Sequence, residues 1–301
     1  MYLHNDKELF TDVLTIVSDR SRISMDIIEK DYYVTMILKT LTKSKFKFVF
    51  KGGTSLSKAF KVISRFSEDI DVTFEEHLGE NRRKKLKYEI LKPIENELGL
   101  KIENFEKIES DKDYNHYDYY YESVCDNIVE GLPSFVKLET ALMSYAFPTE
   151  TKTISNYIYD AMGSENKELI DKYDLHPFEM YVQSLERTYI DKIFAICDYY
   201  LLDKPQRNSR HLYDIYMISN HVDIELVKKL FPKVREHRMK MGDKIAPSAN
   251  PQINIKQIYK EIIENEFYKS DYNQVTSRLV LDEISYEEVT NKIIEIIKEL
   301  E

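Results

Sequence analysis

The chain has 301 residues, a length that fits two domains or one large one. Its formal net charge is −10, so no global positive field draws it to nucleic acid or to anionic membranes, and a polyanion must be met by a local basic patch. The two cysteines, Cys125 and Cys197, lie far apart and imply no disulfide framework, and the polar N-terminus lacks a signal-peptide core. We therefore expect a soluble cytoplasmic protein without a membrane segment.

The first half of the chain alternates between helical and strand-like patterns. Apolar residues recur at helical spacing in two stretches before residue 44, and apolar and polar residues alternate on both sides of a Gly-Gly turn. A charged helix with a basic start follows and ends at Gly99. The predicted helices cover 5–18, 24–43, 54–63 and 81–98, and the predicted strands cover 46–50, 67–74, 114–121 and 135–140.

The second half of the chain, after about residue 150, is mostly helix-like, with a short strand near 180–183. The predicted helices cover 186–202, 207–220, 222–232, 252–268 and 284–301. The sequence thus predicts a mixed α/β region followed by a helical region.

The Gly-Gly turn is the first feature that indicates chemistry. Two glycines after a strand let the backbone take positive φ and approach a ligand closely, and the free N–H groups at the start of the next helix can face a phosphate. The turn lacks the Gly-Lys-Ser/Thr ending of a P-loop and the spacing of a Rossmann fingerprint. Taken alone, such a turn is more often only a tight connection. The residues that could contact phosphate here are Lys51, Gly52, Gly53, Thr54, Ser55 and Lys58.

Two carboxylates follow on the next predicted strand. Asp69 and Asp71 are two residues apart, so both lie on one face with their α-carbons about 6.5–7 Å apart. Such a pair suits Mg²⁺, or two ions about 3.5–4 Å apart that clamp a transferring phosphate. An isolated pair is usually a solvated strand face, but its place one helix beyond a phosphate-type turn favours phosphoryl or nucleotidyl transfer. Glu139, on a later strand, is the best candidate for a third carboxylate, with an ordinary solvent-facing charge as the alternative.

The order of these pieces resembles the nucleotidyltransferase superfamily of the DNA polymerase beta type. More narrowly, the chain is similar to the AbiEii-type nucleotidyltransferase family, which supplies toxins of bacterial toxin–antitoxin and abortive-infection systems. The most specific match is RFSEDID at 65–71. The other matching blocks are EKDY at 29–32, KGGTSL at 51–56, ERT at 186–188, KIFAI at 192–196 and RHLYD at 210–214.

The resemblance implies an α+β fold, in which a nucleotidyltransferase-type mixed β-sheet with flanking helices is followed by a C-terminal α-helical bundle domain. It assigns residues 1–150 to the nucleotidyltransferase domain and residues 151–301 to a helical domain that contributes to the active-site cleft.

The same resemblance implies roles for individual residues. Asp69 and Asp71 would bind Mg²⁺ or Mn²⁺, with Glu139 completing the metal site. Lys192 would act as a point cation for phosphate charge, and Asp214 as a base or as the residue that positions Lys192. The nucleotide-binding residues would be Lys51, Gly52, Gly53, Thr54, Ser55, Lys58, Arg65 and Ser67.

One of these positions leaves an alternative open, and Thr54 and His211 depart from the family pattern. For Arg65, a buried ion pair is the alternative to a phosphate contact. Thr54 stands where many superfamily members have Ser. His211 stands where many relatives have Asp, so no acidic role is carried over to that position.

The function implied is a Mg²⁺-dependent nucleotidyltransferase that moves an NMP, or part of an NTP, to an acceptor hydroxyl. By resemblance, the acceptor is an RNA such as tRNA, and the protein is the toxin of a toxin–antitoxin or abortive-infection system with a cognate protein or RNA antitoxin. Two alternatives stay open: a catalytically silent NTP-binding regulator, and a metal-dependent nuclease or phosphohydrolase.

Two basic runs and one aromatic cluster could also contact RNA. The runs at 82–87 and 228–244 could bind a phosphate backbone, although basic helix faces are usually only solvated. The tyrosines within 117–121 could stack bases, but packing in a strand is the expected role.

Overall fold

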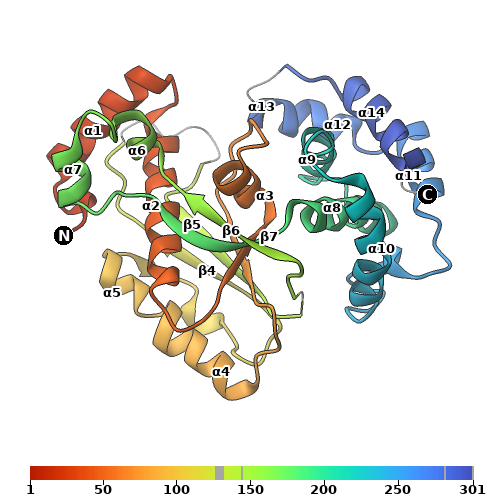
Figure 1. Ribbon diagram of the computed structural model, residues 1–301, viewed down its shortest axis with the longest axis horizontal. Coiled ribbons are helices and arrows are strands. Elements are labelled where there is room, and N and C mark those ends of the chain that lie inside the picture. The colour runs from red at the N-terminus through yellow and green to blue at the C-terminus, as the bar shows by residue number, and fades with distance from the viewer. Residues whose placement is uncertain (126–131, 144, 281–282, 300–301) are drawn as a thin grey trace. The chain divides into compact units, whose positions relative to one another are not determined.

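A computed structural model gives the fold of residues 1–125, 132–143, 145–280 and 283–299 (Figure 1). The chain forms two compact units, which interleave along the sequence. The first unit consists of Met1–Ala59, Ser67–Tyr145 and Thr149–Val182, and the second consists of Phe60–Phe66, Ala146–Pro148 and Gln183–Glu301.

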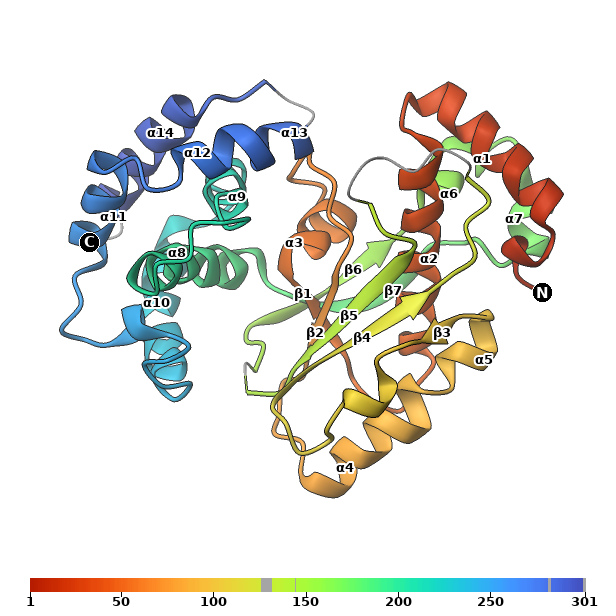
Figure 2. The ribbon, with the colours of Figure 1, turned by 180° about the vertical axis from the view of Figure 1, so that it is seen from behind.

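The first unit is built on a mixed sheet whose described strands follow the order β3-β4-β5-β2-β1-β7-β6 (Figures 1 and 2). Strand β2 lies at its centre, antiparallel to β1 and parallel to β5. The strands are β1 (Val49–Lys51), β2 (Ile70–Thr73), β3 (Lys101–Ile102), β4 (Tyr114–Tyr120), β5 (Phe135–Ala141), β6 (Thr149–Ile154) and β7 (Phe178–Gln183). The mixed sheet confirms this part of the predicted fold class.

Helices flank this sheet within the first unit. They are α1 (Lys7–Ser21), α2 (Met25–Thr42), α3 (Gly52–Ser55), α4 (Glu80–Lys85), α5 (Ile94–Leu98), α6 (Tyr157–Met162) and α7 (Lys167–Lys172). A π-helical turn, Leu56–Phe60, continues α3 directly, and a second one, Leu86–Leu91, follows α4.

One face of the sheet is apolar and covered. Ile70 and Leu138 point to it and are completely buried, and Tyr33 of α2 stacks on Tyr121, just after β4, with 4.1 Å between ring centroids. Helix α2 therefore packs against this face, as both views of the ribbon show. Because side chains alternate along a strand, Asp71 points to the opposite face.

The second unit is helical, which confirms the predicted C-terminal helical region. Its helices are α8 (Leu185–Leu201), α9 (Arg210–Ile218), α10 (Ile224–Met239), α11 (Ile255–Glu264), α12 (Lys269–Asp271), α13 (Ser277–Leu279) and α14 (Tyr286–Glu299). Helix α8 packs against α9, α10 and α11. The hydroxyls of Tyr259 and Tyr268 donate to the α8 carbonyls of Ile193 and Ile196 at 3.1 and 2.8 Å. The end of the predicted helix at 300–301 lies outside the described residues.

The predicted strand over 46–50 is wrong in its bounds. Phe46 and Phe48 precede β1, because a tight turn occupies this stretch: the Phe46 N–H donates to Ser44 Oγ at 3.2 Å, and the Phe48 N–H donates to the Phe46 carbonyl at 3.0 Å. The two rings instead cluster with Phe74, at centroid distances of 6.0 and 5.1 Å.

Other short elements differ from the sequence-based expectation. The single helix predicted over 81–98 is divided into α4, a π-helical turn and α5, with Pro93, which has no N–H to donate, just before α5. The prediction missed β3, β6, α6 and α7. Strand β3 has two residues and β6 reads TETKTI, so neither carries a clear apolar alternation.

Across the described residues, no helix combines the length and the apolar character that crossing a lipid bilayer would require.

Candidate active site

Four ionisable side chains form one row across the sheet of the first unit. In the strand register, Glu139 of β5 lies opposite Asp71 of β2, and Asp71 lies opposite Lys51 of β1. On the other side, His116 of β4 lies opposite Glu139. Residues directly opposite one another point to the same face, so two carboxylates meet at the centre of the row with a basic side chain at each end.

The two central carboxylates are in direct contact. Burial and the neighbouring Glu139 raise the pKa of Asp71 to about 7, with Lys51 opposing the rise and Asp69 adding to it. Asp71 and Glu139 are joined by a side-chain hydrogen bond. In the protein without a bound cation, the protonated Asp71 therefore donates to Glu139, since two adjacent half-buried carboxylates cannot both ionise at low cost.

Gly52 brings the backbone against this pair. Its φ is +76°, and a Cβ at this position would lie 1.9 Å from Asp71 Oδ2. Only glycine combines that backbone conformation with that close approach. The turn is therefore packed directly against the carboxylate.

The hydroxyls that follow the turn hold its structure. Thr54 Oγ1 donates to the carbonyl of Asp69 at 2.5 Å and lies 2.9 Å from Ser67 Oγ, while Ser55 Oγ donates to the carbonyl of Gly52 at 2.9 Å. Thr54 and Ser55 are buried. Their side chains tie the turn to the segment before β2, so the turn presents its backbone rather than these hydroxyls.

The two lysines near the turn differ in their surroundings. Lys51 is half-buried in the carboxylate row and acts on Asp71. Lys58 is buried, and its ammonium lies 2.5 Å from Asp31 Oδ1 on α2. The charge of Lys58 is thus met by a protein carboxylate.

The carboxylate row has the donor set for a hard divalent cation. Among the described residues, no group of three or more His, Cys, Asp or Glu side chains is arranged as a ready metal site. However, Asp71 and Glu139 offer carboxylate oxygens that are already in contact through a side-chain hydrogen bond. A divalent cation suits such a pair, because it neutralises two charges that burial otherwise keeps from ionising together.

A second charged cluster lies inside the second unit. The Arg65 guanidinium donates two bonds to Asp214 of α9, Nε to Oδ1 at 2.7 Å and Nη2 to Oδ2 at 2.8 Å. Lys192 of α8 donates to the same Oδ2 at 2.6 Å. Asp214 is fully buried, and the side chains of Arg65 and Lys192 are 3% and 7% exposed, so these charges satisfy one another out of contact with bulk water.

The electrostatics of this cluster keep Asp214 ionised. Burial opposes its charge, but Arg65 and Lys192 outweigh burial and hold the pKa of Asp214 well below its usual range. Burial lowers the pKa of Lys192, and Asp214 opposes that shift. Burial, together with Lys192, holds the pKa of His211 well below its usual value, so His211 stays neutral. An aspartate with three cationic donor bonds is a poor proton acceptor, and its chemistry is that of a residue that positions Lys192.

Tyr114 and His116 are site neighbours that the sequence did not single out. The Tyr114 hydroxyl donates to Glu139, and its side chain is 53% exposed. Both residues reach the site because of how β4 aligns with β5. No pattern in the sequence reveals that alignment. Tyr117 and Tyr119 are buried, in agreement with the expected packing role of that cluster.

Several cations of the two basic runs have protein partners. Arg83 Nη2 donates to Asp113 at 2.7 Å, and the buried Lys87 donates to the carbonyl of Ile108 at 2.6 Å. Arg238 bridges two aspartates of α8. These side chains have structural roles.

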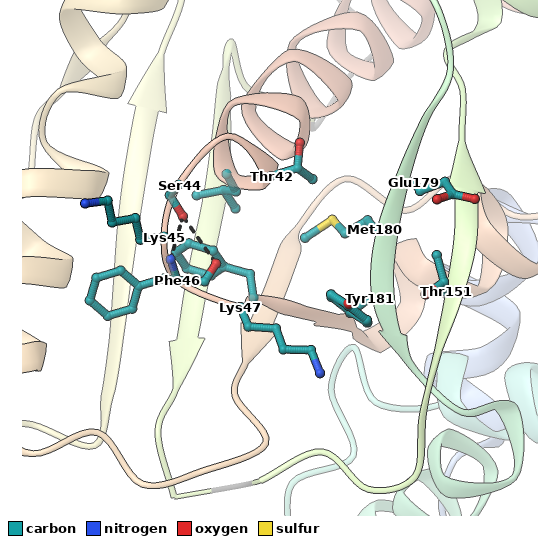
Figure 3. A pocket seen from close by; sticks show the side chains of 11 residues that line it. Thr42, Ser44, Lys45, Phe46, Lys47, Thr151, Glu179, Met180 and Tyr181 are labelled. Carbon is teal, nitrogen blue, oxygen red and sulfur yellow. Dashed lines mark hydrogen bonds between the residues drawn. The ribbon is translucent and has the colours of Figure 1, made fainter.

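A cavity of about 410 Å³ opens beside the start of β1, in the first unit (Figure 3). Its lining comes from the end of α2, from the turn before β1 and from β6 and β7, and includes Lys47 and Tyr181. The Lys47 ammonium lies 4.1 Å from the centroid of the Tyr181 ring. None of the described residues that line it belongs to the carboxylate row, which lies at the other end of β1.

Comparison with known protein families identifies the family of this chain. The family model described as "Nucleotidyl transferase AbiEii toxin, Type IV TA system" matches residues 37–292. The chain belongs to this family. The resemblance seen in the sequence is thereby confirmed, and with it the coarse activity of a nucleotidyltransferase toxin. The residues 29–32 lie before the matched span.

A solved structure shares the fold at low sequence identity. MenT4, a nucleotidyltransferase toxin from Mycobacterium tuberculosis H37Rv, is similar with a TM-score of 0.55 and 14% identity, over 95% of this chain and 89% of that one. A putative nucleotidyltransferase from H. pylori is similar with a TM-score of 0.47 and 17% identity, over 92% of this chain and 96% of that one. No curated protein matches the chain.

The close approach of Gly52 to Asp71 predicts the effect of one methyl group. Gly52→Ala adds left-handed strain of about 1–2 kcal/mol and a clash with Asp71, so the free energy of unfolding should fall by at least that amount. Urea denaturation measures it. Gly79→Ala is the matched control, because no atom lies within 4 Å of the added Cβ, and it should change stability by less than about 1 kcal/mol. Equal stability of the two variants would contradict the packing of the turn.

The raised pKa of Asp71 predicts a pH-dependent stability in the metal-free protein. Its pKa is about 7 in the folded state and about 3.9 in an unfolded chain, so folded protein takes up a proton as the pH falls through 7 and gains stability down to about pH 4. Asp71→Asn carries no charge at any pH. We expect it to be more stable than the unmodified protein by about 2–4 kcal/mol at pH 8, with the difference vanishing near pH 4.

Urea denaturation in EDTA at several pH values measures this difference. The control is Asp12→Asn, at an exposed position of α1, which should change stability little at any of them. A loss of stability in Asp71→Asn at pH 8 would rule out the proton-sharing pair.

Proposed function

We propose that the protein transfers an NMP, or part of an NTP, to an acceptor hydroxyl in a reaction that depends on Mg²⁺ or Mn²⁺. The observation that carries this proposal is the contact of Asp71 with Glu139 beside the close-packed Gly52 turn. Paired carboxylates next to a backbone turn suit a reaction in which phosphate charge must be held and moved.

In this proposal Asp69, Asp71 and Glu139 hold the divalent cation. The cation, when bound, neutralises charge on the phosphates and lowers the barrier to attack on phosphorus. Glu139 accepts the proton of the attacking hydroxyl, while the Tyr114 hydroxyl orients its carboxylate. The backbone of Gly52 and Gly53 faces the phosphates, and Lys51 adds positive charge.

The charged cluster of the second unit has a supporting role. Asp214 fixes the direction of the Lys192 ammonium, and the resemblance to the family assigns that ammonium a role in stabilising phosphate charge. Arg65 holds Asp214 in place with two parallel hydrogen bonds. Arg65 and Lys58 therefore act through protein carboxylates in this proposal, and Thr54, Ser55 and Ser67 act by holding the turn.

The acceptor and the biological setting follow from membership of the family. We propose an RNA such as tRNA as the acceptor, and a role in the cytoplasm of a bacterium as a defence toxin restrained by an antitoxin. The family description, which names a type IV toxin–antitoxin system, supports an antitoxin partner.

Transfer of radiolabel tests the proposal. The protein is incubated with each NTP, labelled at the α- or γ-phosphate, with Mg²⁺ and total tRNA. We expect α-label in the RNA, and a loss of about 10²–10³-fold in Asp69→Asn and Asp71→Asn, because each removes a charge that holds the cation. The control is Asp12→Asn, at an exposed position of α1, which should transfer label normally.

Three results would contradict the proposal. Tight NTP binding without transfer would indicate a regulator. Shortened RNA or released phosphate without RNA labelling would indicate a hydrolase. Full activity of Asp71→Asn would place the chemistry elsewhere.

A further inference from the structure

Three consecutive charged residues of α2 are buried. Glu29 and Lys30 are each 1% exposed, and Asp31 is 8% exposed. Successive helical residues point about 100° apart, so these side chains cannot share one partner and must reach three different directions. Because burial of each charge costs several kcal/mol before pairing, a helix that needed only to pack would carry apolar residues here.

Lys30 reaches the segment that precedes the carboxylate strand. Its ammonium forms an ion pair with Glu68, and it donates to the carbonyl of Pro133, just before β5, at 2.8 Å. Glu68 is the residue directly before Asp69. The Lys30 ammonium thus contacts the segments that precede both β2 and β5, the strands that carry Asp71 and Glu139.

Asp31 reaches the helix that follows the glycine turn. Its Oδ1 lies 2.5 Å from the ammonium of Lys58, and its Oδ2 accepts from the N–H of Tyr157 at 3.0 Å. Lys58 lies in the π-helical turn that continues α3. Glu29, the third charge, accepts from the N–H of Val124 at 2.9 Å and from Ser123 Oγ at 2.5 Å.

The backbone before β2 is therefore held from two sides. Thr54 donates to the carbonyl of Asp69 from the glycine turn, and Lys30 holds Glu68 from α2. The turn is itself fixed to α2 through Lys58 and Asp31.

We propose that Lys30 and Asp31 are positioning residues of the carboxylate site: Lys30 fixes the segment that presents Asp69 and Asp71, and Asp31 fixes the helix behind the glycine turn. The effect on turnover rests on the proposed nucleotidyl transfer. The effect on the geometry of the segment does not.

Positioning and stability can be separated experimentally. Removing one partner of a buried ion pair is destabilising mainly because the other charge stays buried and unpaired, but the Glu68 side chain is 26% exposed and can turn into water when Lys30 is lost. Lys30→Met should therefore fold. Lys39→Met is a matched control on the same helix, because Lys39 is 13% exposed and also forms an ion pair, with Asp174 at 2.7 Å.

Hydrogen–deuterium exchange of the full-length protein is the direct test. We expect the peptide over 67–74 to exchange about tenfold faster in Lys30→Met, with unchanged exchange in the helices of the second unit and no effect on 67–74 in Lys39→Met. Unchanged exchange at 67–74 overturns the proposal. Faster exchange throughout the molecule also overturns it, because it shows that Lys30 serves only global stability.

Steady-state kinetics on the same variants test the effect of Lys30 on turnover. In Lys30→Met we expect kcat to fall about 10–100-fold with the KM for NTP changed less than about threefold, because a displacement of about 1 Å affects the reacting geometry more than substrate binding. An unchanged kcat in Lys30→Met overturns the proposal. If the unmodified protein transfers no nucleotide, the proposed function fails while the exchange result still decides whether Lys30 fixes the segment.

Discussion

The contact of Asp71 with Glu139 is the constraint on which the site depends. Two carboxylates on neighbouring parallel strands repel one another when both are ionised, so their contact persists only with a proton or a cation between them. The surrounding sequence accommodates this contact. Lys51 flanks it, glycine at position 52 lets the backbone approach, and hydroxyls rather than further charges tie the turn to the strand.

Asp71 and Asp214 show how environment assigns different chemistry to one residue type. Burial and a neighbouring carboxylate raise the pKa of Asp71 to about 7, whereas Arg65 and Lys192 outweigh burial and hold the pKa of Asp214 well below its usual range. The Asp71 carboxyl therefore changes its charge near neutral pH. Asp214 is permanently charged and fixes a cationic side chain.

The sequence was sufficient for the parts of the site that depend on local pattern. The period of two residues predicts that Asp71, next to the buried Ile70 of β2, points away from the apolar face, and the Gly-Gly turn needs no tertiary information to be recognised. The sequence was not sufficient where the register of the strands decides which side chains meet. The pairing of Glu139 with Asp71 and the contact of Tyr114 with Glu139 depend on how β5 and β4 align. The block EKDY at 29–32 was matched by resemblance, but the burial of Glu29, Lys30 and Asp31 was beyond reach, since charges on a helix are normally exposed.

A crystal structure with Mn²⁺ and a non-hydrolysable NTP analogue tests the central claim most directly. We predict an anomalous Mn²⁺ peak within coordination distance of the Asp71 and Glu139 carboxylates, with the triphosphate against the Gly52 turn. A metal bound elsewhere, or Asp71 and Glu139 still hydrogen-bonded to each other beside a bound nucleotide, would contradict it.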